Sequence, residues 1–290
     1  MKQALIKLHI SVFLAGFTGA LGVLIQLNEG ILVWYRILLT VVTLFVWLSW
    51  KKSIEKIAAL TVWKLLGIGS LIALHWVCFY GSIKASNVSI GLVCFASVGL
   101  FTAILEPLLT DKKFSWAEVG LGMISLLGIY LIFHFDARYR TGILIGIASA
   151  LLAALFSVLN KKKVDIVPPK TLMLYELSGG LLILTLLMPV YLHYFPTTYI
   201  FPTLSDLGWL LVLSWLCTVL AMDLMLQALK KISAFTQNLS LNLEPVYGIL
   251  LAFILFKENE KLNNSFYMGF SLIVLSVVLQ MLRVVRRKQL

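Results

Sequence analysis

Long apolar stretches alternate with short polar segments along the whole chain. Most of these stretches are close to the ~20 residues that a tilted helix needs to cross ~30 Å of hydrocarbon. The ten stretches cover residues 8–25, 31–50, 62–83, 88–109, 114–133, 142–159, 171–192, 207–229, 232–256 and 266–282. This pattern predicts an all-α integral membrane protein with ten transmembrane helices. Because nine further spans follow, we do not expect the first to be removed as a signal peptide.

The composition agrees with a membrane protein. Of the 290 residues, 60% are hydrophobic and 13% are charged, and the mean hydropathy is +0.97. A soluble core needs no such apolar excess. The connections are short, and the longest, at residues 193–206, leaves no room for a soluble catalytic domain. We therefore expect the functional surface to lie within the helix bundle.

The net charge of +11 is distributed unevenly between the loops. If the amino terminus is cytoplasmic, eighteen lysines and arginines fall on the inner side. Only five fall on the outer side, namely Lys84, Arg138, Arg140, Lys257 and Lys261. This positive-inside asymmetry orients the protein and requires no nucleic acid partner. We expect both termini in the cytoplasm and a location such as the bacterial inner (plasma) membrane.

Cysteine and histidine give no sign of a metal centre or a cofactor. The three cysteines lie inside predicted spans, where they behave as small apolar residues, and imply no disulfide. The four histidines lie on separate elements without metal-ligand spacing, and no nucleotide-binding glycine loop is found. We therefore expect neither a metal nor a cofactor.

Ten spans divide into five and five, with residues 1–138 and 139–290 as the two repeats. Since five is odd, the second repeat would be inverted relative to the first, as in many secondary transporters. Lys84 and Lys230 open the fourth and ninth spans, and Lys112 and Glu258 follow them by 28 residues. The two spans therefore align at an offset of 146 residues. Only three identities occur over residues 81–113 and 227–259, so the repeat rests on length and polarity.

The tripeptide Leu-Glu-Pro occurs twice inside apolar stretches, at residues 105–107 and 243–245. A charged side chain at membrane depth costs ~2.5–3.5 kcal/mol, so it is a functional candidate by default. Each proline removes a backbone donor and leaves an earlier carbonyl open. In the 146-residue register Glu244 aligns with Val98 and Glu106 with Ala252, so the two tripeptides are not equivalent.

Several runs resemble the EamA-type permeases of the drug/metabolite transporter superfamily. They are Trp34-Tyr35-Arg36, residues 73–84 (ALHWVCFYGSIK), residues 86–89 (SNVS), residues 242–248 (NLEPVYG) and Lys257-Glu258. The first half departs from the family pattern, since Gly99 and Lys112 stand where proline and glutamate are usual. The resemblance implies a ten-helix inverted repeat that carries small metabolites, often amino acids or related amphipathic compounds, by alternating access.

Glu244 is the main candidate for substrate or proton binding. It lies 14 residues past Lys230 and 13 before Lys257, which at ~1.5 Å per residue places it ~20 Å from either boundary, at the midplane. At 100° per residue its helical face includes Gln237, Ser240 and Tyr247, whereas Asn238 and Asn242 fall near the opposite face. The alternative is a structural carboxyl beside a proline kink.

The other polar positions each have two interpretations. Arg36 could hold a carboxylate substrate or anchor the helix at the interface. His75, Trp76 and Tyr80 could line a cavity or pack helices together. Gate or structural roles are expected for Glu106 (near Lys112 and Lys113), Pro107, Pro245, Glu176 and Asp223, although Glu106, Glu176 and Asp223 could also contact substrate or form ion pairs.

We therefore expect a secondary transporter whose partners are a small-molecule substrate, the lipid bilayer and, as a coupling ion, the proton. Export is expected from the resemblance alone. An integral membrane enzyme acting on lipid would need catalytic groups that converge near one interface, and these residues do not cluster that way. A non-transporting membrane scaffold or sensor would not need a midplane carboxylate.

Overall fold

The computed structural model describes residues 2–135, 137–241 and 243–286, and every regular element in these ranges is helical, so the all-α prediction is confirmed. The elements are α1 (Lys2–Leu24), α2 (Glu29–Trp50), α3 (Ala59–Ala85), α4 (Val88–Phe95), α5 (Val98–Leu109), α6 (Trp116–Phe135), the 3₁₀ turn η1 (Ala137–Tyr139), α7 (Arg140–Lys161), α8 (Pro169–Tyr194), α9 (Leu204–Ser214), the π-helix η2 (Trp215–Leu220), α10 (Ala221–Leu229), α11 (Ala234–Leu241), α12 (Glu244–Phe256), the 3₁₀ turn η3 (Glu258–Lys261) and α13 (Asn264–Arg286).

Each predicted apolar stretch lies on one helix or on consecutive helices. Seven spans are long and apolar enough to cross a membrane, including α4 with α5 and α9 with η2 and α10. The apolar parts of α6, α12 and α13 are shorter. Large apolar side chains cover the outside, among them Trp50, Trp116 and Ile254, and such a surface suits contact with lipid rather than water.

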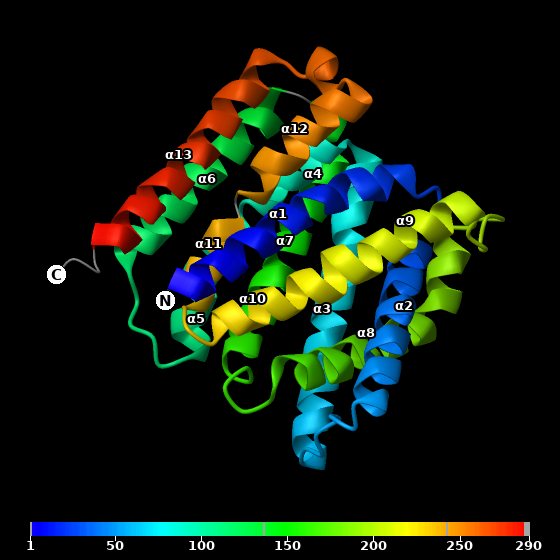
Figure 1. The fold of residues 1–290 in the computed structure, drawn as a ribbon. Helices are drawn as coiled ribbons and strands as arrows, with labels where there is room; N and C mark the ends of the chain where they lie inside the picture. Colours follow the sequence, from blue (N-terminus) through cyan, green and yellow to red (C-terminus); the bar gives the residue numbers. More distant parts are fainter. Residues whose placement is uncertain (1, 136, 242, 287–290) are drawn as a thin grey trace.

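The helices form one bundle with α3 and α7 at its centre (Figure 1). Helix α3 packs on α7 and on α8, while α1 packs on α10 and α12. The pair α6 and α13 lies on one side of the bundle, and α2 with α8 lies on the other (Figure 1). The span made of α4 and α5 is the most enclosed of the seven.

Two of the spans contain a break. The fourth changes direction at Ala96 and Ser97, between α4 and α5, and the ninth is interrupted between α11 and α12. Pro245 stands in the first turn of α12, where a helix has no internal partner for a backbone N–H. Pro107 lies inside α5, two residues before its end. The second Leu-Glu-Pro therefore begins a helix, whereas the first lies near a helix end.

Glycines allow α3 and α8 to approach each other closely. A Cβ on Gly69 would lie 1.6 Å from the backbone oxygen of Glu176, and a Cβ on Gly179 would lie 2.2 Å from that of Leu66. Small residues at such contacts let two helix backbones pack directly. This contact fixes α8 against the centre of the bundle.

Replacing Gly69 with alanine should destabilise the fold by about 3 kcal/mol, since the carbonyl that it meets cannot rotate away as a side chain could. Gly67 is the matched control, because a Cβ there has nothing within 4 Å. Gly67→Ala should keep or raise the stability by about 0.5–1 kcal/mol. Thermal unfolding in detergent measures both variants, and equal melting temperatures would contradict the close contact of α3 with α8.

Candidate functional site

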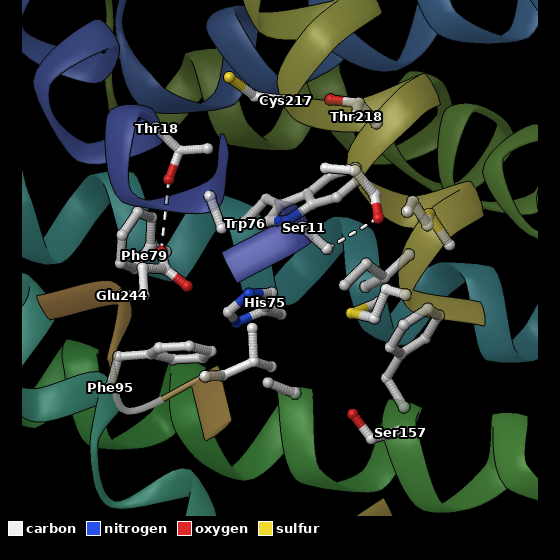
Figure 2. A pocket seen from close by; sticks show the side chains of 18 of the residues that line it. Ser11, Thr18, His75, Trp76, Phe79, Phe95, Ser157, Cys217, Thr218 and Glu244 are labelled. Carbon is white, nitrogen blue, oxygen red and sulfur yellow. Dashed lines mark hydrogen bonds between the residues drawn. The ribbon is translucent and has the colours of Figure 1, made fainter. Parts of the chain in front are cut away.

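A cavity of about 100 Å³ lies in the middle of the bundle, enclosed by residues from α1, α2, α3, α4, α7, η2, α10, α11 and α12. Its wall is largely aromatic and thioether, with Trp76, Phe79, Phe95, Phe156, Met222 and Met225. The cavity has two charged residues, Arg36 and Glu244. Figure 2 shows Glu244, His75, Trp76 and Phe95 around the same space.

Arg36 is held firmly although it is buried, with only 3% of its surface exposed. Its Nε donates to Thr218 Oγ1 at 2.8 Å, its Nη1 to the Tyr80 hydroxyl at 3.1 Å and its Nη2 to the Cys217 carbonyl at 3.4 Å. The guanidinium carbon lies 3.8 Å from the centre of the Trp76 ring, a cation–π distance. These contacts fix the plane of the guanidinium at the cavity wall.

The π-helix η2 supplies two of those partners. Because a π-helix pairs residues five apart, it distorts the regular ladder and is often found at functional sites. The Thr218 hydroxyl donates to the carbonyl of Leu213, five residues earlier, and accepts from Arg36. Ser214, just before η2, donates to the Arg36 carbonyl at 3.1 Å. The distorted segment therefore holds both the backbone and the side chain of Arg36.

Glu244 reaches the same cavity as the first residue of α12, and 5% of its surface is exposed. The Thr18 hydroxyl donates to its Oε1 at a long 3.5 Å (Figure 2). Among the described residues no ion pair joins Glu244 to Arg36 or to any other cation. The carboxylate and the guanidinium thus share one cavity without neutralising each other directly.

His75 lies between these groups and is fixed by α7. Its Nδ1 is 2.8 Å from the Ser149 hydroxyl and 3.0 Å from the Ser149 carbonyl, and that hydroxyl also lies 3.0 Å from the His75 carbonyl. The imidazole packs near the Phe95 ring, with 5.3 Å between ring centres. His75 is therefore a positioned cavity residue with an aromatic neighbour.

Asn238 connects the cavity to the fourth span. Its Nδ2 donates to Thr102 Oγ1 at 2.8 Å, and its Oδ1 accepts from the Ser157 hydroxyl at 2.9 Å. Both Asn238 and Ser157 line the cavity. One buried amide thus holds α5, α7 and α11 together.

The expected helical face of Glu244 differs from the observed one. Asn238 lines the cavity with Glu244, whereas Gln237, Ser240 and Tyr247 do not. Asn242 lies outside the described residues. Extrapolation at 100° per residue fails here because the helix is interrupted between Leu241 and Glu244, so the two segments do not share one axis.

The other residues of that predicted face have different neighbours. The Ser240 hydroxyl donates to the Thr236 carbonyl. Tyr247 packs on α1, edge-on to Phe13, and its Cβ would be 2.7 Å from a Cβ on Gly16. Gln237 is fully buried, and its amide has no hydrogen-bond partner among the described residues. Tyr80 is outside the cavity wall and supports Arg36 instead.

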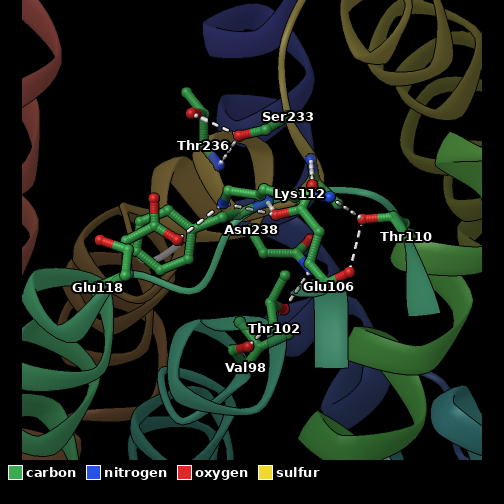
Figure 3. Close-up of polar contacts among 12 residues, drawn as sticks. Val98, Thr102, Glu106, Thr110, Lys112, Glu118, Ser233, Thr236 and Asn238 are labelled. Carbon is green, nitrogen blue, oxygen red and sulfur yellow. Dashed lines mark hydrogen bonds and ion pairs between the residues drawn. The ribbon is translucent and has the colours of Figure 1, made fainter. Parts of the chain in front are cut away.

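Glu106 holds the amino-terminal end of α11. Its two carboxylate oxygens accept from the backbone N–H groups of Ala234 at 2.9 Å and Phe235 at 3.0 Å. Lys112 Nζ lies 2.9 Å from Glu106 and 2.7 Å from Glu118, so it joins both carboxylates (Figure 3). We call this set of contacts the Glu106 clamp.

Glu258 makes the equivalent contacts to α4, and we call them the Glu258 clamp. Its oxygens accept from the backbone N–H groups of Val88 at 3.1 Å and Ser89 at 3.0 Å, and from the Ser89 hydroxyl at 2.6 Å. The backbone donors of the two clamps are 146 residues apart, Val88 with Ala234 and Ser89 with Phe235. The carboxylates themselves are 152 residues apart.

Glu176 and Asp223 lie away from the cavity. Asn160 Nδ2 donates to Glu176 Oε2 at 3.3 Å, while Glu176 Oε1 and Asn160 Oδ1 have no partner among the described residues. Asp223 lies 3.8 Å from Lys170, a partly exposed ion pair. These contacts place both carboxylates between helices rather than at the cavity.

Several cavity residues were not singled out from the sequence. Thr18, Phe95, Asn238 and Thr218 lie in apolar stretches whose composition resembles any other span. Thr218 could not be found from helical spacing, because the π-helix shifts its direction. Asn238 carried a polar signal, but the uninterrupted helix assumed for its span placed it on the wrong face.

Replacing Thr218 with valine should lower the stability by about 1–3 kcal/mol, because Arg36 Nε would lose its acceptor inside the bundle. Thr198→Val, at an exposed position between α8 and α9, is the matched control and should change little. Thermal unfolding in detergent compares the two. An unchanged melting temperature for Thr218→Val would mean that Arg36 does not depend on η2.

Comparison with known proteins identifies the second half of the chain. A crystal structure described only as "Crystal structure of protein" has a TM-score of 0.72 over 99% of each chain at 14% identity, which indicates a shared fold and no more. No match is found among curated proteins. Residues 140–282 match the EamA-like transporter family. The resemblance predicted from sequence is thereby confirmed, and the chain carries an EamA-family domain in an integral membrane protein.

Proposed function

We propose that the protein is a secondary transporter of the drug/metabolite type that moves a small amphipathic metabolite, such as an amino acid or a related compound, by alternating access. The observation that carries the proposal is the pair Arg36 and Glu244, which are both buried in one central cavity and are not paired with each other. The EamA-family domain supports the same class of function.

The cavity suits a ligand with charged and apolar parts. A guanidinium has five N–H donors, and three contacts to the protein leave others for a carboxylate ligand. Glu244 has one long hydrogen bond and can accept from an amine or take up a proton. The aromatic and methionine wall would contact the apolar part. His75 and Trp76 would position the ligand between the two charges.

We further infer ten spans arranged as two inverted five-helix repeats, residues 1–138 and 139–290. The 146-residue offset between the clamp donors supports this arrangement, since it is the offset at which the fourth and ninth spans align. The family match over residues 140–282 falls within the second repeat. Arg36 and Glu244 come from different repeats, so a ligand that binds both would bridge them.

The proposed location is a bacterial inner membrane with both termini in the cytoplasm. This orientation rests on the loop charges, with eighteen lysines and arginines on one side and five on the other. Export as the direction rests on the family alone, and proton coupling rests on Glu244 as the acceptor.

Reconstitution into liposomes tests the transport proposal. A panel of radiolabelled amino acids and related compounds is offered with and without a pH gradient. Glu244→Gln should abolish gradient-driven flux, because the amide cannot carry a proton or pair with an amine. Arg36→Lys should reduce flux at least about tenfold, since an ammonium cannot replace a bidentate fork.

Asp223→Asn is the control, because that carboxylate lies outside the cavity wall. It should transport like the native chain. Gradient-driven flux that is unchanged in Glu244→Gln would contradict the assigned role of Glu244. No flux of any compound by the native chain would favour a non-transporting membrane protein.

Single-cysteine labelling tests the orientation. The native cysteines Cys78, Cys94 and Cys217 are first replaced by alanine. In intact cells a membrane-impermeant maleimide should label Glu260→Cys, between α12 and α13. Lys52→Cys, after α2, should react only once the cells are permeabilised. Both positions are exposed, so the reverse pattern would indicate the opposite topology.

A further inference from the structure

We propose that Glu106 and Glu258 are the two gate residues of the transporter, one at each end of the central cavity, a role that rests on the proposed transport function. Each carboxylate binds two backbone N–H groups at the start of a helix from the other repeat. Opening one face requires one clamp to release while the other stays closed.

The clamps hold the helices that line the cavity. Helix α5 packs on α11 and α12 packs on α4, so each clamp joins the end of one broken span to the start of the other. Helices α4 and α11 have eight residues each, a length of about 12 Å. Each has its start in a clamp and its last residue, Phe95 or Leu241, at the cavity. A ligand in the cavity therefore touches the far end of a clamped helix.

Both clamps are closed in this structure, and the cavity between them is small. Such a state corresponds to an occluded transporter. A hollow of about 580 Å³ reaches Glu258 from the other side, lined also by Lys84, Asn87 and Gln26. Water in this hollow can hydrate the carboxylate and the helix start as soon as the Glu258 clamp releases. On the proposed topology this is the outer gate.

The two clamps differ in what each carboxylate keeps after release. Lys112 is paired with both Glu106 and Glu118, so Glu106 keeps a cation when α11 moves away. The described partners of Glu258 are the N–H groups of α4 and the Ser89 hydroxyl. The inner gate can therefore open with its carboxylate still paired, whereas the outer gate must expose its carboxylate to water.

Amide hydrogen exchange of the full chain in nanodiscs reads the clamps directly, because the amides of Ala234, Phe235, Val88 and Ser89 are the clamp donors. Glu106→Gln should speed exchange at the start of α11 by about tenfold, the loss of one charge-assisted hydrogen bond. Exchange at the start of α4 should stay unchanged or become slower. Glu258→Gln should produce the reverse pattern.

Two neighbouring carboxylates are matched controls. Glu118→Gln removes a partner of Lys112 and leaves the N–H contacts of Glu106, so α11 should keep its native exchange. Glu260→Gln changes an exposed charge two residues after Glu258 and should leave α4 unchanged. Ser89→Ala removes the hydroxyl contact alone and should give a smaller acceleration at α4. This milder variant keeps the test available if a glutamine variant does not fold.

Acceleration at both helix starts in either glutamine variant would indicate general loosening and overturn the proposal. Native exchange in both variants, or the same effect in the controls, would also overturn it. Since exchange is measured without a substrate, this outcome is separate from the liposome assay. Absent flux with opposite exchange patterns would reject transport and leave two independent clamps.

Discussion

Backbone groups at a helix end need hydrogen-bond partners, and lipid supplies none. The rest of this structure depends on how that requirement is met in the two broken spans. At the starts of α4 and α11 a carboxylate accepts two N–H groups. At the start of α12, Pro245 removes a donor that would have no internal partner. At the end of α4, the Ser97 hydroxyl donates to the Cys94 carbonyl.

The same requirement explains where the charges lie. An isolated ion inside an apolar bundle is costly, and several hydrogen bonds are needed to hold it. Arg36 has three hydrogen bonds and an aromatic face, and its carbonyl partner, Cys217, belongs to the π-helix. Glu244 stands at a helix start, where the dipole favours a negative charge. Distorted helices and buried charges therefore occur together because each stabilises the other.

Hydropathy was sufficient to predict the helices, because an apolar stretch of fixed length is the condition for a span. It could not predict the breaks, since α4 and α5 together read as one continuous run. The misplaced face of Gln237 and Asn238 follows from that, because a single helical axis was assumed across residues 232–256. Arg36, Glu244, His75 and Trp76 were named from residue type alone, and the structure brings these four together at one cavity.

Aligned sequences concealed the relation between Glu106 and Glu258. Glu106 lies in the last turn of α5, three residues before its end, whereas Glu258 follows the end of α12 and the left-handed residue Lys257. The carboxylates are thus shifted by six positions relative to their targets, and a residue-by-residue alignment places Lys112 opposite Glu258. Lys112 instead supports Glu106 from the side. What the two halves share is the contact with a helix start, and different positions on the chain can supply it.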